Sequence, residues 1–183
     1  MLDAAIQAFW AKGYEATSMA DLLEVTGLHK GSLYQAFGDK HALFVAALRR
    51  YLEGMRSRKN VLLRETESPL EGIRAVAHAL VDLASEDEPI RKGCLAMNTL
   101  IELAPHDPEV AEVMHSHLAE MRRSLTTQVA AAQEAGEVDA GKDPGAVALM
   151  IMTFMAGLAT TLKGPMDEAT AHRLLDAQIE AIR

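Results

Sequence analysis

Two short helices and a tight turn are encoded in residues 17–44, TSMADLLEVTGLHKGSLYQAFGDKHALF. Ser18 can cap the first helix, with Asp21 three residues later in the position of the capping-box acid. Gly27 ends this helix, because glycine adopts a positive φ without steric cost. A second helix is predicted from about Lys30 to Ala36. This arrangement predicts a helix-turn-helix, whose second helix enters the major groove of DNA.

The second helix has two chemically different faces. Apolar residues spaced to face inward in this region are Leu22, Leu28, Leu33, Ala36 and Phe37. One cation, two hydroxyls and one amide are then left facing outward: Lys30, Ser32, Tyr34 and Gln35. Side chains of these types bind phosphates and base edges. The pattern therefore predicts a DNA-reading surface.

Four blocks of residues between positions 2 and 44 match positions that are typical of one known family. They are Phe9…Gly13-Tyr14…Thr17, Thr26-Gly27, Lys30-Gly31-Ser32-Leu33-Tyr34 and Phe37…Lys40…Leu43. With them, this segment resembles the DNA-binding domain of the TetR/AcrR family of bacterial transcriptional regulators. The resemblance implies a one-component regulator that binds DNA as a dimer and releases it on binding a small molecule.

The resemblance also implies which residues contact DNA. At the reading helix and the start of the next helix these are Lys30, Ser32, Tyr34 and Lys40. Thr17 and Ser18 are expected at another phosphate, and Gly31 is expected to let the backbone approach DNA closely. Two positions depart from the family pattern. His29 replaces a common capping serine and is expected to face DNA instead, while Leu23 replaces a common alanine.

The charge distribution agrees with a DNA-binding end, although the whole chain has a net charge of −8. Residues 1–64 contain nine Lys and Arg against six Asp and Glu, and residues 65–183 contain nine against twenty. The first region is therefore net +3 and the second net −11. The basic region coincides with the predicted helix-turn-helix.

Composition and periodicity predict an all-α chain. Aromatic residues are only 4% of the total, and Ala, Leu and Met, which favour helices over strands, are abundant. About nine helices are predicted, near residues 2–12, 19–25, 30–36, 40–65, 69–85, 91–104, 108–135, 144–162 and 167–182. The predicted domains are a helix-turn-helix DNA-binding domain at 1–44 and a ligand-binding and dimerisation domain at 45–183, linked by the long fourth helix.

The small-molecule effector is expected to bind inside the second domain. The candidate pocket residues combine adaptable apolar side chains with one polar amide: Cys94, Met97, Asn98, Ile101, Met121 and Leu125. In an equally simple interpretation, all six residues belong to the hydrophobic core. Cys94 also suggests a thiol-based redox or electrophile sensor, because Arg91 and Lys92 lie nearby and a helix start favours the thiolate. In the opposing interpretation, Cys94 is a small buried residue of the hydrophobic core.

The dimer is expected to form from the helices near 146–162 and 167–182. The first is apolar around its circumference. At 17 residues including three Thr it lies at the lower limit for a membrane span and falls short of one, so no membrane partner is predicted. Two such helices from each chain can form a four-helix bundle. The expected interface residues are Phe154, Leu158, Leu175 and Ile179.

Other function classes find little support. His115 and His117 point in different directions on a helix, and no other histidine has ligand spacing, so no metal site is predicted. No arrangement typical of an enzyme and no cofactor motif occurs. One cysteine and an opening segment without a signal-peptide pattern indicate the cytoplasm. The main hypothesis is a homodimeric repressor that a small molecule releases from a palindromic operator. The alternatives are the Cys94 sensor and a helical dimer without ligand gating.

Overall fold

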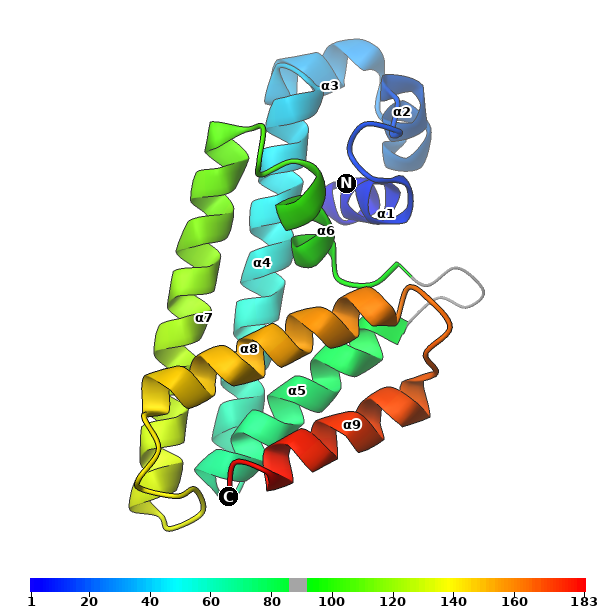
Figure 1. Cartoon of the computed structure of the whole chain (residues 1–183). Coiled ribbons are helices and arrows are strands. Elements are labelled where there is room, and N and C mark those ends of the chain that lie inside the picture. Colours follow the sequence, from blue (N-terminus) through cyan, green and yellow to red (C-terminus); the bar gives the residue numbers. More distant parts are fainter. Residues whose placement is uncertain (86–91) are drawn as a thin grey trace.

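The structure, a computed structural model, describes residues 1–85 and 92–183 (Figure 1). Within these residues there are nine α-helices and no strand, which confirms the all-α prediction. The helices are α1 (Leu2–Lys12), α2 (Met19–Thr26), α3 (Lys30–Phe37), α4 (Lys40–Glu65), α5 (Pro69–Ser85), α6 (Leu95–Glu102), α7 (Pro108–Glu134), α8 (Pro144–Thr161) and α9 (Glu168–Glu180). The predicted sixth helix is shorter than expected and begins only after Cys94.

Polar caps set where the helices of the DNA-binding end begin. The Ser18 hydroxyl accepts a hydrogen bond from the Asp21 amide, and the Asp21 carboxylate accepts one from the Ser18 amide, which completes the predicted capping box. Gly27 ends α2 in the left-handed region at φ 67°. His29 makes no side-chain cap at α3, as expected. Asp39 caps α4 by accepting from the Ala42 amide.

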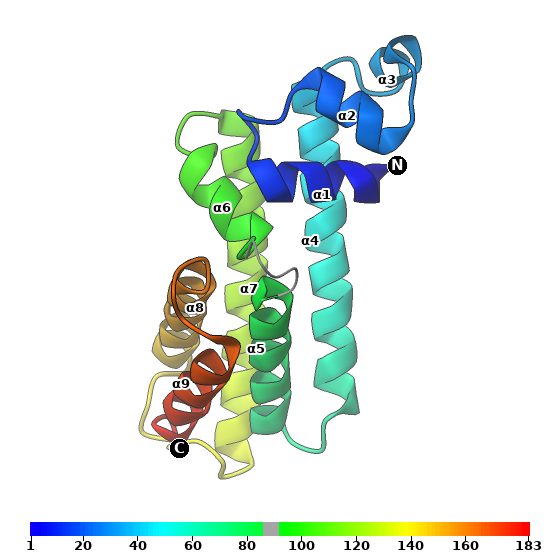
Figure 2. The same cartoon turned by 90° about the vertical axis from the view of Figure 1, so that its right-hand side faces the viewer.

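Helix α4 connects the two ends of the molecule (Figure 1). Its 26 residues span about 39 Å at the α-helical rise. The first half packs against α1 and the remainder packs against α5, while α7 also packs against this helix (Figure 2). Its buried side chains all lie in the first half: Leu43, Phe44, Val45, Ala47, Leu48, Tyr51 and Leu52. The helix is therefore anchored most firmly beneath the helix-turn-helix.

The buried core does not divide at residue 44. Leu95 of α6 and Met114 of α7 belong to the same hydrophobic cluster as the core of α1 to α4. Hydrogen bonds cross the same border: the Trp10 indole donates to the Gly93 carbonyl at 3.0 Å, and the Glu102 carboxylate accepts from the Tyr14 and Glu15 amides at 3.3 and 3.1 Å. A shift of α6 would therefore reach the α1–α2 turn directly.

Helices α8 and α9 lie on the flank of the molecule opposite α4 (Figure 2). Three of the four expected interface residues were assigned wrongly, because Leu158, Leu175 and Ile179 are only 4%, 1% and 1% exposed within the protomer. Phe154 is half-buried and packs against the same core. The large apolar side chains that α8 and α9 leave in solvent are instead Leu149, Met150 and Leu174.

Helix α8 also satisfies the length and composition of a membrane span, which corrects the expectation that it falls short. Its inner face nevertheless packs into the helical bundle, where Val147, Ala148 and Ile151 join the cluster of α5 and α7. Only 22% of the helix is buried in this way. Much of its apolar surface is therefore available for another helix.

Candidate nucleic-acid interface

The outer face of α3 is solvent-accessible along its whole length. His29, Gly31 and Ser32 are exposed, and so are Lys30, Tyr34 and Gln35 on the same helix. Leu33, which is 0% exposed, anchors the opposite face of the helix to the core. The structure therefore presents the predicted set on one surface.

The inward residues of this region were predicted less accurately. Leu22 and Leu33 are fully buried, and Leu28 and Phe37 are partly buried against the same core. Ala36 is exposed and was assigned to the inner face wrongly. Helix α3 is only eight residues long, so one buried leucine and its flanking residues hold it in place.

Lys30 and Tyr34 lie one helical turn apart on the exposed face. The Lys30 ammonium lies 5.8 Å from the centre of the Tyr34 ring, which is at the outer limit of a cation–π contact. Tyr34 is 42% exposed. A cation and a phenolic hydroxyl at this spacing can bind neighbouring phosphates of one DNA strand.

Gly31 is not required by the fold. A methyl group added there would meet no atom within 4 Å, and its φ lies outside the left-handed region. The absence of a side chain can therefore matter only to a molecule that approaches α3 from outside.

We expect Gly31→Ala to separate folding from DNA binding. Alanine should stabilise the helix by about 0.5 kcal/mol, because glycine loses more conformational entropy on folding. The added methyl group should weaken operator binding, because it holds the helix backbone away from DNA. Chemical denaturation and fluorescence anisotropy on the same preparation measure both effects. A variant with unchanged operator affinity would show that the α3 backbone does not approach DNA closely.

The start of α2 differs from the prediction at Thr17. Its side chain is fully buried, and its hydroxyl donates to the Gly13 carbonyl at 2.6 Å and lies 3.4 Å from the Ala8 carbonyl. It therefore fixes the α1–α2 turn and cannot reach a phosphate. Ser18 is exposed, but its hydroxyl is used in the capping box.

The acidic group at this helix start is neutralised by a neighbour. Lys12 lies 2.6 Å from Asp21 and, together with Ser18, holds the pKa of the Asp21 carboxyl far below its usual range. Asp21 therefore stays ionised at any pH where DNA is bound, and the capping box stays intact. The Lys12 ammonium offsets a negative charge that would otherwise repel a phosphate.

Lys40 is placed differently from Lys30. Its ammonium lies 4.3 Å from the centre of the Tyr14 ring, and it donates to the Glu15 carbonyl at 3.4 Å. Lys40 therefore links the start of α4 to the α1–α2 turn. A contact of Lys40 with a phosphate, which stays a prediction, would have to coexist with or replace this link.

The predicted effector residues do not meet around one cavity. Cys94 and Met97 pack against the core beneath the helix-turn-helix, whereas Met121 and Leu125 belong to the cluster of α5, α7 and α8. Ile101 is 67% exposed and lines no interior. The predicted pocket composed of these residues is therefore wrong.

Asn98 and Cys94 have local structural partners. Asn98 donates to the Lys92 carbonyl at 2.9 Å and accepts from the Lys163 ammonium at 3.1 Å, so it holds the segment before α6 against the end of α8. Cys94 is the N-cap residue of α6, is partly buried, and has its Sγ 3.7 Å from the Tyr51 hydroxyl. Arg91, expected to act on this thiol, lies outside the described residues. The packing of Cys94 fits the core interpretation.

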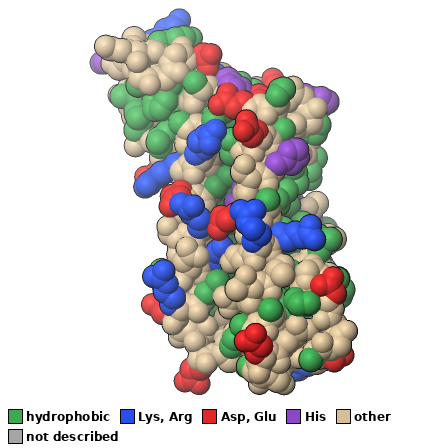
Figure 3. All heavy atoms as spheres, turned by 90° about the vertical axis from the view of Figure 1, so that its left-hand side faces the viewer, with side chains coloured by type: hydrophobic (Ala, Val, Ile, Leu, Met, Phe, Trp, Pro, Cys, Tyr) green, Lys and Arg blue, Asp and Glu red, His purple; other side chains and the backbone are tan. Residues whose placement is uncertain are grey.

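A cavity of about 430 Å³ that is open to solvent lies between α4 and α7. Figure 3 views this side of the molecule, where Lys and Arg side chains lie among Asp and Glu side chains. Two apolar residues, Leu52 and Val113, contribute to its lining. The remaining lining is polar or charged: Arg49, Glu53, Arg56, Glu112, Ser116, His117 and Glu120. Burial lowers the pKa of His117, which keeps its imidazole neutral at pH 7.

Sequence reasoning missed these cavity residues for an identifiable reason. The position of α7 relative to α4 cannot be deduced from local periodicity, so the sequence does not show that Arg49 and Arg56 line this cavity. Lys59 also lies beside α7, because its side chain is only 12% exposed and its ammonium lies 3.1 Å from the Glu120 carboxylate. Glu102, which accepts from two amides of the α1–α2 turn, had no sequence signal at all.

Comparisons with known proteins agree with this geometry. The family described as bacterial regulatory proteins of the tetR family matches residues 1–47, and a tetracyclin repressor-like C-terminal domain matches residues 69–177. The regulator YezE of Bacillus subtilis is 34% identical over 149 residues, covering 81% of this chain and 76% of YezE. The repressor ComR of Escherichia coli is 31% identical over 164 residues, covering 88% and 77% of the two chains.

A solved structure extends the likeness to the whole chain. A cysteine mutant of the TetR-family regulator CifR, in a complex with a 26-base-pair operator, superimposes with a TM-score of 0.86 at 26% identity. The match covers 100% of this chain and 95% of that one. The fold, the exposed reading helix and the similar proteins all indicate the same family. The chain belongs to the TetR family of bacterial transcriptional regulators.

Proposed function

We propose that the protein is a homodimeric repressor that binds a palindromic operator in the cytoplasm and is released by a small molecule. Residues 1–44 read DNA in this proposal, and the remainder dimerises and binds the effector. The observation that carries it is the polar outer face of α3, which Leu33 holds in a fixed orientation. Repression is favoured because ComR, a relative over most of the chain, is a repressor.

The apolar flank of α8 supports the dimer. Exposed residues recur at helical spacing along this helix: Ala146, Leu149, Met150, Thr153, Gly157 and Thr160. Leu174 and Ala177 of α9 are exposed as well. A two-fold axis beside α8 and α9 would pack two helices from each chain into a four-helix bundle, with Gly157 allowing close approach.

The cavity between α4 and α7 is the proposed effector site. Its volume of about 430 Å³ suits a small molecule. Its lining favours a polar effector that carries both charged and apolar groups. A ligand that pushes on α4 there would move the helix that begins beside the reading helix, and release requires it to prefer the moved state by about 1 to 3 kcal/mol.

Lys30→Ala tests DNA reading by α3. Removing one phosphate-binding cation per chain should weaken operator binding and reduce the slope of log K against log salt by about 1 for each chain bound. Fluorescence anisotropy at several salt concentrations measures both quantities. Arg123→Ala, which removes an exposed cation from α7, is the matched control and should leave affinity and slope unchanged. Equal slopes for Lys30→Ala and wild type would contradict DNA binding through this face.

A further inference from the structure

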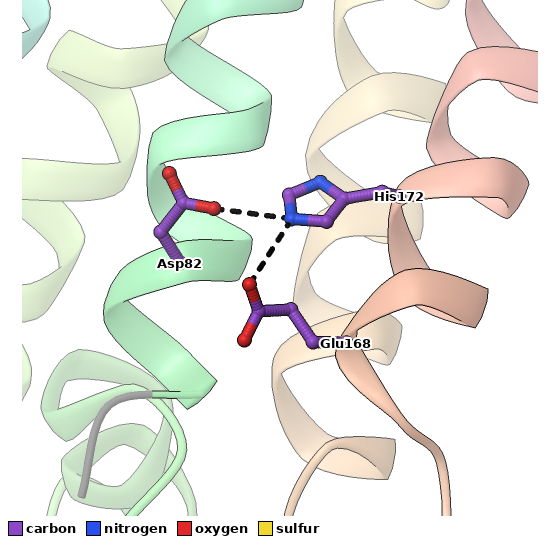
Figure 4. A group of neighbouring side chains, drawn as sticks. All are labelled: Asp82, Glu168 and His172. Atoms are coloured by element: carbon purple, nitrogen blue, oxygen red, sulfur yellow. Dashed lines mark ion pairs between the residues drawn. The ribbon is translucent and has the colours of Figure 1, made fainter.

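Helices α5 and α9 bring three potential metal ligands together (Figure 4). His172 Nε2 lies 3.1 Å from Asp82 Oδ1 and 3.7 Å from Glu168 Oε1. One ligand atom from each of the three residues lies within 4.8 Å of the others. Asp82 belongs to α5 and the other two to α9, so the group bridges two helices near one end of both.

The other side of the His172 ring is held in place. His172 Nδ1 lies 2.5 Å from His78 Nδ1, and His78 Nε2 lies 3.0 Å from Asp176 Oδ1. Arg74 in turn donates to Asp176 at 2.5 Å. The two imidazole rings are nearly parallel, with an interplanar angle of 18°. This chain of contacts fixes the orientation of His172, as residues behind a metal-binding histidine commonly do.

The contacts between the two histidines can leave His172 Nε2 without a proton. Only one proton can lie between the two Nδ1 atoms at 2.5 Å. If His172 donates it, His78 can accept it and donate its Nε2 proton to Asp176. His172 Nε2 then directs a lone pair toward Asp82 and Glu168. Because a lone pair and two carboxylates repel one another, this position favours a cation.

We propose that Asp82, Glu168 and His172 bind one divalent transition-metal ion such as zinc. One imidazole nitrogen and two carboxylate oxygens form a ligand set that zinc accepts, at about 2.1 Å from each ligand atom. Ligand atoms on such an ion lie about 3 to 3.5 Å apart, close to the 3.1 and 3.7 Å observed.

The surroundings suit an ion with open coordination positions. The Asp82 and Glu168 side chains are 48% and 52% exposed, so both can adjust and water can complete the coordination shell. His172 is only 24% exposed and supplies the fixed point. A bound ion would cross-link α5 to α9, and α9 belongs to the flank where the second chain is proposed to bind.

Zinc titration of the metal-stripped full-length chain by calorimetry tests the site. Cys94→Ser is used as the background in every sample, so that the thiol cannot compete for zinc. The background protein should bind one zinc ion per chain, and Asp82→Asn, Glu168→Gln and His172→Gln should each lose this saturable binding. His78→Asn should weaken binding by about 10-fold, because it only positions His172.

His41→Gln is the matched control. His41 also lies between two carboxylates, but they face different nitrogens of its ring. Asp107 lies 2.6 Å from Nε2, and Glu109 lies 3.9 Å from Nδ1. One ion therefore cannot bind a single nitrogen of His41 together with both carboxylates. This variant should bind zinc as the background protein does. A second measurement is thermal: zinc at 100 times its dissociation constant should raise the unfolding midpoint by about 5 °C in the background protein. The three ligand variants should show no such rise.

Two results would overturn the proposal. One is the absence of saturable zinc binding in the background protein. The other is unchanged zinc affinity in a protein that carries both Asp82→Asn and Glu168→Gln. These two residues are exposed and neither belongs to a core cluster, so their variants should fold even if His172→Gln does not.

Discussion

Met150→Glu should convert the protein into a monomer that binds its operator at least about 100-fold more weakly. Met150 is 52% exposed on the outer face of α8, so a glutamate there disturbs no contact within the protomer. In the proposed four-helix bundle it would place two like charges near the two-fold axis in an apolar interface. Each monomer would then bind one half-site alone, without the gain in affinity from linking two sites. Analytical ultracentrifugation and anisotropy measure the two effects.

Two controls separate dimer loss from unfolding. Val61→Glu places the same charge at a 49%-exposed position on α4, away from the α8–α9 flank, and should remain dimeric. Leu158→Glu introduces the charge into the core, where Leu158 is 4% exposed, and should lower the free energy of unfolding rather than produce a folded monomer. If Met150→Glu and Leu149→Glu both remain dimeric, the interface lies elsewhere.

Leu33→Ala should lower the free energy of unfolding by about 3 kcal/mol and remove specific operator binding. Leu33 is the buried residue of the eight-residue α3 and is 0% exposed. Truncation leaves a cavity beneath the reading helix, which has no side-chain cap at its N-terminus to help hold it. The residual affinity should be that of non-specific binding, because the polar face no longer has one orientation.

Val25→Ala is the control for this substitution. Val25 lies on α2 and is 46% exposed, so its truncation should change the free energy of unfolding by no more than about 0.5 kcal/mol. Urea denaturation measures stability, and competition between operator and random-sequence DNA measures specificity. A Leu33→Ala protein that still discriminates operator from random DNA would show that α3 does not depend on this anchor.

The helix-turn-helix could be predicted from sequence because its determinants are local. Ser18 and Asp21 cap α2 within three residues, and Gly27 ends it in the left-handed region. Such signals need no knowledge of distant parts of the chain. Ala36 was misplaced because periodicity over an eight-residue helix fixes its orientation only approximately.

The dimer face of α8 could not be predicted in the same way. This helix is apolar on every side, so its sequence has no polar face to mark which residues point to solvent. Leu158 and Met150 are both apolar residues of α8, and only the packing of Leu158 against side chains of α5 and α9 distinguishes the buried residue from the exposed one.

The predicted effector pocket failed for a related reason. The segments that contain Cys94 and Met121 are each amphipathic, but periodicity does not say which core cluster each one joins. The structure assigns them to different clusters. His172 and Asp82 show the opposite case: they are far apart in sequence, so no local spacing could reveal that they lie 3.1 Å apart.

The stoichiometry of the protein bound to its operator tests the central claim most directly. Footprinting of the DNA upstream of the protein's own gene supplies the operator, which should be palindromic with half-sites about 34 to 36 Å apart. Light scattering with a duplex of that sequence should then give two chains per duplex, and no stable complex with a scrambled duplex. One chain per duplex, or equal binding to the scrambled sequence, would contradict a homodimer that reads a palindrome.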